Sequence, residues 1–274
     1  MPVKQAAAKF REHIKRALTV FALGLTPLIS STQAADLAIV MDDIGHSLPR
    51  AARVMQLPGM FTVGLLPFAP NTEEIARLAH AAGKEVILHL PMQPRSTREQ
   101  ENETGTLTLD MPPDKFADLL DAALRAVPHC VGINNHAGSL LTEHRAPMVR
   151  LMRHIRRRGL FFLDSRTSPN TLAYTVAQEW QVPATKRDVF LDHRLERVAI
   201  AAEFKRALGI ARKNGHAVLI AHPHRMSLDF LKTAMATLPD DVRLISLSEL
   251  TNRRRPTMFA RLENPKFPRK LPVL

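Results

Sequence analysis

A chain of 274 residues, 45% of them hydrophobic, is long enough for one large domain with a substantial core. The formal net charge of +12 is concentrated at the two ends, because residues 1–34 carry a net +4 and residues 253–274 a net +6. The body, residues 35–252, is therefore nearly neutral at about +2, which argues against a nucleic-acid-binding face. The single cysteine, Cys130, excludes an internal disulfide and is interpreted as a buried apolar residue.

The N-terminal segment has the pattern of a signal peptide. Basic residues between Lys4 and Arg16 precede an apolar stretch at 17–29, which is short for a membrane span. Small residues then lead to Ala34, after which we expect cleavage; an uncleaved anchor is the alternative. Both readings predict that the rest of the chain is periplasmic or otherwise exported.

From residue 37 onward, apolar runs alternate with amphipathic segments, the pattern of an α/β fold with a parallel sheet. Strands are predicted at 37–41, 61–66, 85–90, 131–134, 160–163, 189–191, 217–221 and 243–246. Helices are predicted at 48–55, 71–82, 113–126, 145–158, 169–180, 197–214 and 227–237. These units favour a distorted (β/α) barrel of about seven parallel strands. A doubly wound open sheet is the alternative, but no glycine-rich phosphate loop follows the first strand.

Local signals set the expected helix ends. Gly83, Gly159 and Gly215 each follow a predicted helix and precede a strand, as C-terminal caps do. At the other ends, a capping box is predicted at Asn71 and an N-cap at Ser168, which precedes a proline.

Two segments fall outside the repeating pattern. Residues 95–110 are polar and form either a lid over the barrel or a mobile surface loop. Residues 253–274 are basic and rich in proline, and we expect a disordered or loosely docked tail that could touch an anionic envelope surface.

Six of the apolar runs end on an aspartate or a histidine. They are LAIVMDD (Asp42, Asp43), EVILHL (His89), VGINNH (His136), LFFLDS (Asp164), DVFLDH (Asp192, His193) and AVLIAHPH (His222, His224). The C-terminal ends of barrel strands meet at one face, and that face carries the chemistry. Aspartate and histidine bind borderline metal ions and transfer protons near neutral pH. The pattern therefore predicts an active site.

A metal site is the first expectation for this face. A histidine at the end of one buried strand can equally be a core residue, but His89 and His136 together with one acid match a zinc site with an open position for water. In the acidic pair, one carboxylate of Asp42 and Asp43 would bind the cation and the other would accept a proton from water.

An acid and its partner are the second expectation. A buried Asp164 near His222 would hold the imidazole tautomer and raise its pKa, which suits a general acid. Of His222 and His224, separated by one proline, only one imidazole is expected to face the centre.

Other polar residues would support these groups. Asn134 and Asn135 could orient the metal ligands or bind polar groups of a substrate. Asp192 is either a further supporting acid or only a neighbour of the following helix.

The ordered set of motifs resembles the divergent polysaccharide deacetylases, relatives of the chitin and peptidoglycan deacetylases, over about residues 36 to 250. The motifs are MDDIG (41–45), ILHLPMQP (87–94), GINNHAGS (132–139), FFLDSRTS (161–168), DVFLD (188–192) and AHPH (221–224). The resemblance implies a distorted (β/α) barrel with Zn²⁺ or a similar ion at its C-terminal face. It also implies that Asp42 is the base, Asp43 a metal ligand, His222 the general acid and Asp164 the residue that tunes this acid.

The chain departs from the family's usual pattern in its second motif. Conventional deacetylases have two histidines four residues apart, whereas Gln93 stands four residues after His89 here. His136 is the natural substitute ligand, although an Arg-Pro motif usually stands there, so the usual substrate-binding arginine would be lost. Trp180 and Tyr174 are the only aromatic residues besides the phenylalanines, which favours a small or modified glycan over a long polymer.

The sequence therefore predicts an exported, metal-dependent hydrolase, with Zn²⁺ the expected ion, that removes N- or O-acetyl groups from an envelope carbohydrate. A non-catalytic glycan-binding or partner-binding module on the same barrel is the first alternative. A barrel metallohydrolase for phosphoesters or amides is the second, and Arg95, Arg166 and Arg225 are its candidate phosphate-binding cations.

Overall fold

The computed structural model describes residues 34–96 and 104–253. The expected signal peptide up to residue 33 and the tail from residue 254 lie outside the described residues. Arg253, expected to be the first residue of the tail, is instead the last residue of a helix and forms an ion pair with Asp36 at 3.0 Å. Among the described helices, none is long and apolar enough to cross a membrane.

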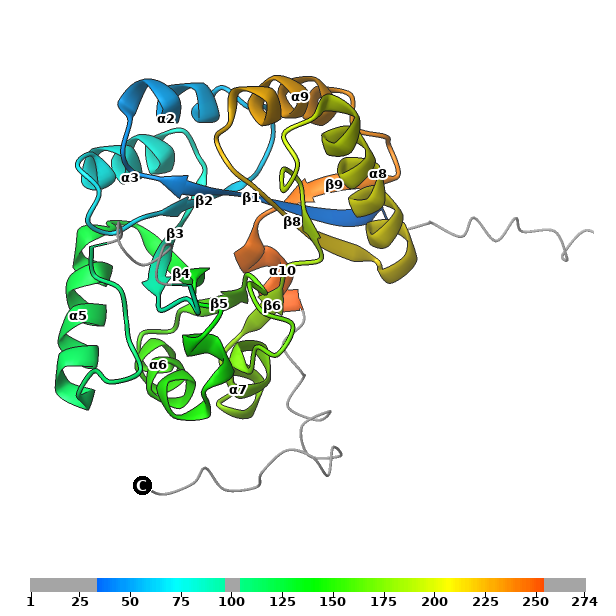
Figure 1. Cartoon of the computed structure of the whole chain (residues 1–274). Coiled ribbons are helices and arrows are strands. Elements are labelled where there is room, and N and C mark those ends of the chain that lie inside the picture. Colours follow the sequence, from blue (N-terminus) through cyan, green and yellow to red (C-terminus); the bar gives the residue numbers. More distant parts are fainter. Residues whose placement is uncertain (1–33, 97–103, 254–274) are drawn as a thin grey trace, which may run out of the picture. The chain divides into compact units, whose positions relative to one another are not determined.

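The described chain alternates strands with helices, as the sequence predicts (Figure 1). The strands are β1 (Ala35–Ile44), β2 (Thr62–Leu65), β3 (Glu85–Met92), β4 (Cys130–Ala137), β5 (Phe161–Asp164), β6 (Ala184–Lys186), β7 (Val189–Phe190), β8 (His216–Ala221) and β9 (Val242–Ile245). The helices are α2 (Leu48–Met55), α3 (Thr72–Ala81), α5 (Pro113–Ala126), α6 (Arg145–Arg157), α7 (Ala173–Glu179), α8 (Arg197–Asn214), α9 (Arg225–Ala236) and α10 (Leu247–Arg253), with a 3₁₀ turn, η1, at Leu141–Glu143.

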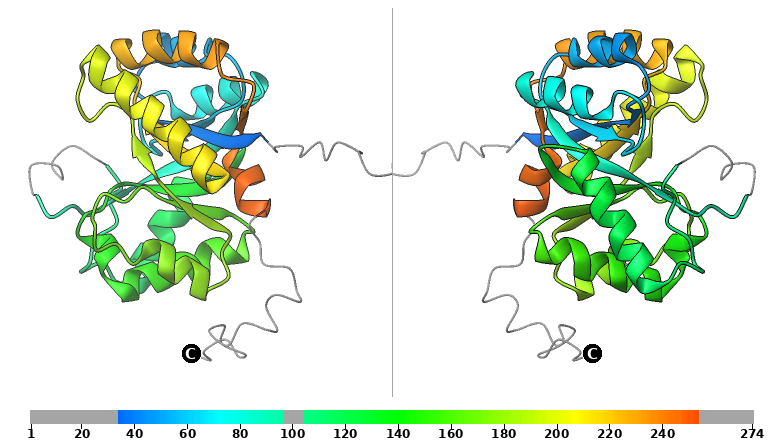
Figure 2. Two further views of the ribbon diagram at one scale, coloured as in Figure 1. Left: turned by 90° about the vertical axis from the view of Figure 1, so that its right-hand side faces the viewer. Right: turned by 90° about the vertical axis from the view of Figure 1, so that its left-hand side faces the viewer.

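The strands form one parallel sheet in the order β6-β5-β4-β3-β2-β1-β8-β7. The sheet curls so that helices cover its outer face (Figures 1 and 2), which confirms the predicted distorted (β/α) barrel. The main order has eight strands rather than about seven, because the three-residue β6 is too short to leave a periodic signal in the sequence. No pairing joins β6 to β7 in the described chain, so the barrel stays open between them.

The distortion is also visible at β1. The strand pairs with β8 along one edge, while its other edge is shared, since β9 pairs with the first four residues and β2 pairs from Val40 onward. A strand with three partners cannot lie in a regular closed barrel.

Alternation along the strands separates two apolar layers. Residues of the outer layer, such as Leu37, Ile39 and Met41 of β1, pack against the helices. The inner layer fills the barrel and is completed by two leucines of α10; its members are Ala38, Val40, Ile87, Phe161, Leu163, Val218, Ile220, Ile245, Leu247 and Leu250. These residues mark the inner row, meaning the alternate side chains that face the barrel interior, of β1, β3, β5, β8 and β9. The continuation of a row beyond the apolar layer leads to the mouth of the barrel.

The helix ends agree only in part with the predicted caps. Gly215 ends α8 in the left-handed conformation, φ 79°, as expected. The predicted capping box is wrong, because the Asn71 side chain donates to the backbone oxygen of His46 instead of capping α3. Ser168 starts no helix either, since its hydroxyl donates to Glu143 and accepts from a nearby backbone N–H, and α7 begins at Ala173.

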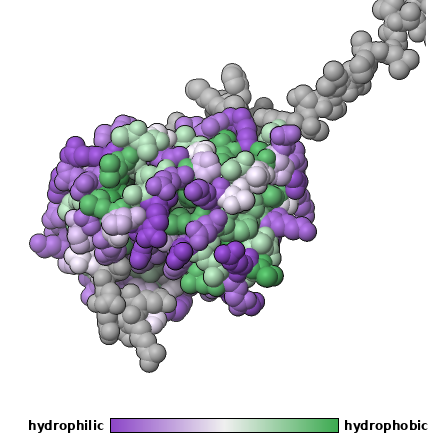
Figure 3. Space-filling model, turned by 90° about the horizontal axis from the view of Figure 1, so that it is seen from above, coloured by the Kyte–Doolittle hydropathy of each residue, from purple (hydrophilic) through white to green (hydrophobic). Residues whose placement is uncertain are grey.

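The helices expose a mixed surface. On the face seen in Figure 3, hydrophilic and apolar residues are interspersed, as amphipathic helices with their apolar side toward the sheet produce.

Candidate functional site

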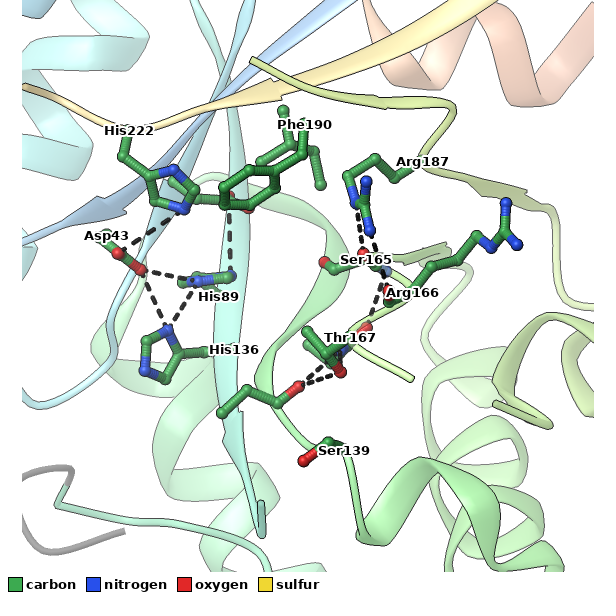
Figure 4. Close-up of a pocket in the computed structure, with 14 residues that line it drawn as sticks. Asp43, His89, His136, Ser139, Ser165, Arg166, Thr167, Arg187, Phe190 and His222 are labelled. Carbon is green, nitrogen blue, oxygen red and sulfur yellow. Dashed lines mark hydrogen bonds and ion pairs between the residues drawn. The ribbon is translucent and has the colours of Figure 1, made fainter. Parts of the chain in front are cut away.

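Asp42 and Asp43, which lie next to each other near the end of β1, both direct their side chains to the mouth of the barrel. Asp42 continues the inner row of Ala38 and Val40, whereas alternation would direct Asp43 outward. The backbone of Asp43 is left-handed, φ 57°, and the pairing with β2 slips between Met41 and Ile44. This irregularity returns the Asp43 side chain to the mouth, where it approaches two histidines (Figure 4). Strained backbone of this kind in a residue other than glycine is concentrated at functional sites.

Asp43, His89 and His136 form a compact group of possible metal ligands. Asp43 Oδ1 lies 3.0 Å from His89 Nε2 and 3.0 Å from His136 Nδ1, and the two nitrogens are 3.0 Å apart. Alternation from Ile87, an inner residue of β3, places His89 on the inner side, and alternation from Ile133, an outer residue of β4, places His136 there as well. Of the residues described, only these three form a group of His, Cys, Asp or Glu compact enough to hold an ion.

The buried Asn134 side chain holds His89 and Asp42 in place through hydrogen bonds. Its Oδ1 accepts from His89 Nδ1 at 2.9 Å, so Nδ1 carries a proton and Nε2 faces the other ligands. Its Nδ2 donates to Asp42 Oδ2 at 2.8 Å and to Ser165 Oγ at 3.2 Å. The buried amide thus connects the predicted base to a predicted ligand, as expected for a supporting residue.

The charges of the site are strongly coupled. Burial alone would raise the pKa of Asp43, but hydrogen bonds from His136 and His89 hold it well below its ordinary value. Burial would lower the pKa of His89, yet the charge of Asp42 and the contact with Asp43 raise it to about 9. The pKa of Asp42 is raised, with burial as the main cause. The group therefore attracts a proton or a cation.

One carboxylate oxygen of Asp42 has no hydrogen-bond donor in the described chain. Among the described residues its buried Oδ1 accepts no hydrogen bond, although His89 Nδ1 lies 3.6 Å away. The same oxygen lies against Gly64 of β2, where an added Cβ would be only 2.0 Å from it. Glycine at this position makes the room that the carboxylate occupies.

His222 lies across the pocket, at the end of the inner row of β8. Its Nδ1 donates to Asp192 Oδ1 at 2.9 Å, and its Nε2 is 3.8 Å from Asp43 Oδ2. Burial would lower the pKa of His222, but the hydrogen bond to Asp192 and the charge of Asp43 raise it. The pKa of Asp192 is lowered, since the hydrogen bond and charge of His222 outweigh the effect of burial.

The predicted pairing of Asp164 with His222 is wrong, and alternation explains why. Leu163 belongs to the inner layer, so the next residue, Asp164, points outward. There its carboxylate accepts from the backbone N–H of Arg166 and Tyr174 and from Thr171 Oγ1, at 2.9, 3.2 and 3.0 Å. Asp164 therefore anchors the segment between β5 and α7.

Two other predicted residues have different surroundings. Asn135 joins β4 to the segment after β5, because its Oδ1 accepts from the backbone of Ser165 at 2.8 Å and its Nδ2 contacts Thr167 at 3.3 Å. His224 is exposed before α9, so only His222 of this pair faces the pocket.

Gln93 and two of the three candidate phosphate-binding arginines contact other residues of the protein. Gln93 Oε1 accepts from the backbone of Leu109, so this side chain fastens part of the 95–110 segment to β3. Of the candidate phosphate-binding cations, Arg95 is paired with Glu143 and Arg225 lies 3.8 Å from Asp229. The third, Arg166, lines the pocket.

The pocket that contains these groups has a volume of about 640 Å³. Its lining includes residues that were not predicted, namely Ser139, Ser165, Thr167, Arg187 and Phe190. Ser165 and Phe190 continue inner rows, so extending the alternation beyond each apolar run would have found them. No periodic signal marks Arg187, which follows β6.

The comparisons with known proteins identify the family. The family model for divergent polysaccharide deacetylases matches residues 39–251. The chain is 39% identical to the uncharacterized protein YibQ of Escherichia coli K12, over 87% of this chain and 74% of that protein. It is 34% identical to an uncharacterized protein of Haemophilus influenzae, over 86% of this chain and 85% of the relative. The crystal structure of the uncharacterized protein ATU2773 from Agrobacterium tumefaciens superposes with a TM-score of 0.75 at 22% identity, covering 81% of this chain and 91% of that one, which shows a shared fold. The chain therefore belongs to the divergent polysaccharide deacetylases.

Proposed function

We propose that this protein is an exported, metal-dependent hydrolase that removes N- or O-acetyl groups from an envelope carbohydrate. One arrangement carries the proposal: three metal-ligand side chains 3.0 Å apart, flanked by the Asp42 carboxylate, whose buried Oδ1 accepts no hydrogen bond in the described chain, and by His222, which Asp192 holds. The family supports a carbohydrate substrate, and the N-terminal sequence pattern supports export.

The donor set fits a borderline divalent ion, with Zn²⁺ the first candidate. Two imidazole nitrogens and one carboxylate oxygen are a usual catalytic zinc set, and tetrahedral bonds of this ion space its ligands by roughly 3.3 Å. The observed spacings of 3.0 Å are close to this value. Asp43, His89 and His136 would hold the ion, which when bound would polarise the acyl carbonyl and acidify a water molecule.

The remaining residues would move protons. Asp42 would accept the proton of the attacking water, since its carboxylate lines the pocket and accepts only the hydrogen bond from Asn134 among the described residues. His222 would donate a proton from Nε2 to the departing oxygen or nitrogen of the sugar, because its Nδ1 is held by Asp192. Both groups line the pocket that holds the three possible metal ligands, so a base and an acid would be available to one substrate.

The direct test is hydrolysis. Protein from residue 35 onward would be assayed, with and without added Zn²⁺, on 4-nitrophenyl acetate and on O- and N-acetylated sugars. We expect acetate release by the wild type, and a loss of at least 100-fold in Asp42→Asn and in His222→Ala. The matched control is His46→Ala, which changes an exposed histidine outside this group.

The alternative of a non-catalytic binding module predicts a different result. Metal would be retained, but no acetylated ester or sugar would be hydrolysed above the rate of the Asp42→Asn variant.

Export is tested separately by fractionating cells and by the N-terminal sequence of the mature protein, which we expect to begin at Ala35.

A further inference from the structure

Two arginines line the pocket without facing a carboxylate there. Arg187 donates from Nε to the backbone oxygen of Ser165 at 2.6 Å and from Nη2 to that of Arg166 at 2.9 Å. The guanidinium of Arg166 makes neither a hydrogen bond nor an ion pair with any residue that the structure describes. The wall of the pocket thus holds two cations that form no ion pair with a described residue.

The nearby acids are engaged elsewhere. Asp164 is buried and accepts from two backbone N–H groups and Thr171. Asp188 accepts from the backbone of Val218 at 2.8 Å. Burial and the charge of Arg166 lower the pKa of Arg187, while the charges of Asp164 and Asp188 act in the opposite direction. An anion bound in the pocket would add a further favourable charge.

The backbone also holds Arg166 in an unusual conformation. Its φ is 51°, in the left-handed region that residues other than glycine seldom adopt. Arg187 and Asp164 hold the peptide groups on either side of it. Strained residues fixed from both sides are found in ligand clamps.

Phe190 connects these cations to the proposed acid. The Arg187 guanidinium lies 5.3 Å from the centre of the Phe190 ring, and this ring is 4.8 Å from that of His222 (Figure 4). One wall therefore runs from His222 across an aromatic side chain to Arg187, and the Arg166 side chain lies beyond Arg187 at the edge of the pocket (Figure 4). An aromatic face beside a proton donor is a suitable surface for a sugar ring.

We propose that the substrate is an acidic sugar, whose carboxylate or phosphate group binds Arg166 and Arg187 while its acyl group lies beside the cluster of Asp43, His89 and His136. The inference rests on the proposed hydrolase function, which it makes more specific. A guanidinium suits both kinds of anion because its planar N–H groups match their oxygen pairs.

The first test is binding, which needs no turnover. D-glucuronate, glucose 6-phosphate and glucose would be titrated into the wild-type protein and into Asp43→Ala, which removes a ligand of the proposed ion, and followed by NMR. We expect at least one acidic sugar to bind at least tenfold more tightly than glucose to both proteins. The tighter of the two identifies the acidic group as carboxylate or phosphate.

Arginine variants then locate the anion site. Arg166→Gln, whose side chain has no partner to lose, should abolish the preference, and Arg187→Lys should weaken it. Arg77→Gln, an exposed arginine of α3, is the matched control and should retain it. Equal affinity for the three sugars, or a preference that survives in Arg166→Gln, would overturn the inference.

Hydrolysis separates this inference from the proposed function. For O-acetylated methyl glucuronoside and methyl glucoside, we expect the acidic ester to have a kcat/KM at least tenfold higher, mainly through KM. Hydrolysis of both esters at equal kcat/KM would leave the function standing and reject the acidic substrate. Tight binding of acidic sugars without hydrolysis of either ester would reject the function and retain the anion site.

Discussion

Asp192 holds His222 through both of its carboxylate oxygens. Oδ1 accepts from the imidazole Nδ1 at 2.9 Å, and Oδ2 accepts from the backbone N–H of His222 at 2.8 Å. Ser227 donates a further hydrogen bond to Oδ2 at 2.7 Å, so the carboxylate itself is fixed. The imidazole can neither rotate nor change tautomer without breaking this arrangement, and its Nε2 is left to face the pocket.

Replacing this carboxylate should weaken the proposed acid. We expect Asp192→Asn to reduce kcat by roughly 100-fold, the usual scale of a general acid's contribution. Because the hydrogen bond to Asp192 raises the pKa of His222, its loss should move the basic limb of the kcat pH profile to lower pH. Steady-state kinetics between pH 5 and 9 measure both effects.

Asp164→Asn is the matched control for that variant. Its carboxylate points away from the pocket and holds the segment before α7. We expect a lower melting temperature with an unchanged position of the basic limb. A shifted limb in Asp164→Asn and an unshifted one in Asp192→Asn would contradict the assignment of His222's partner.

Gly64 should be essential for the position of the proposed base. In Gly64→Ala the new Cβ would lie 2.0 Å from Asp42 Oδ1, so the carboxylate must move. We expect kcat to fall by at least about 100-fold while the bound metal remains, because none of the three ligands contacts this position.

Gly209→Ala, in α8, is the control, since no atom lies within 4 Å of its added Cβ. It should keep full activity and gain up to about 1 kcal/mol of stability from the better helix propensity of alanine. Normal turnover in Gly64→Ala would argue against Asp42 as the base.

The stability of the metal-free protein should depend on pH through His89. Its pKa is raised from 6.5 to about 9 in the folded protein, so the folded state holds a proton that the unfolded state releases between these values. The stabilisation is complete below pH 6.5 and is lost as the pH rises through 9. We expect the free energy of unfolding in urea with EDTA to fall over this window, by up to about 3 kcal/mol.

A variant isolates this contribution. His89→Gln should reduce the dependence between pH 6.5 and 9, leaving the smaller part that the raised pKa of His222 contributes, whereas His46→Ala should keep all of it. An equally steep fall in His89→Gln would assign the effect to other groups.

Much of the barrel could be predicted because its strands are apolar runs with polar ends. The bounds of α2, α5 and α8 match the predicted ranges, and the group of Asp43, His89 and His136 forms at the predicted face. Short elements escaped prediction: β6 has three residues, and α10 begins one residue after β9. The start of α10 does carry a signal, because Ser246 precedes Glu249 by three residues and accepts from its backbone N–H at 3.1 Å.

The misassigned acid has a different cause. Asp164 and Asp192 both end apolar runs, and only alternation distinguishes them, since Leu163 and Phe190 belong to the inner side of the barrel. A residue one step after Leu163 points outward, whereas one two steps after Phe190 points inward. Asp43 is an exception to this alternation, because its left-handed backbone turns its side chain inward. No neighbouring residue in the sequence predicts that conformation.

The most direct test of the central claim is the metal content of protein from residue 35 onward, purified without added metal. The metal content would be measured by inductively coupled plasma mass spectrometry for the wild type, Asp43→Ala, His89→Ala and His136→Ala, with His46→Ala as the control. We predict about one equivalent of zinc or a related ion in the wild type and the control, and its loss in the other three variants. A wild type that holds no metal and takes up none from added zinc would contradict the proposed hydrolase.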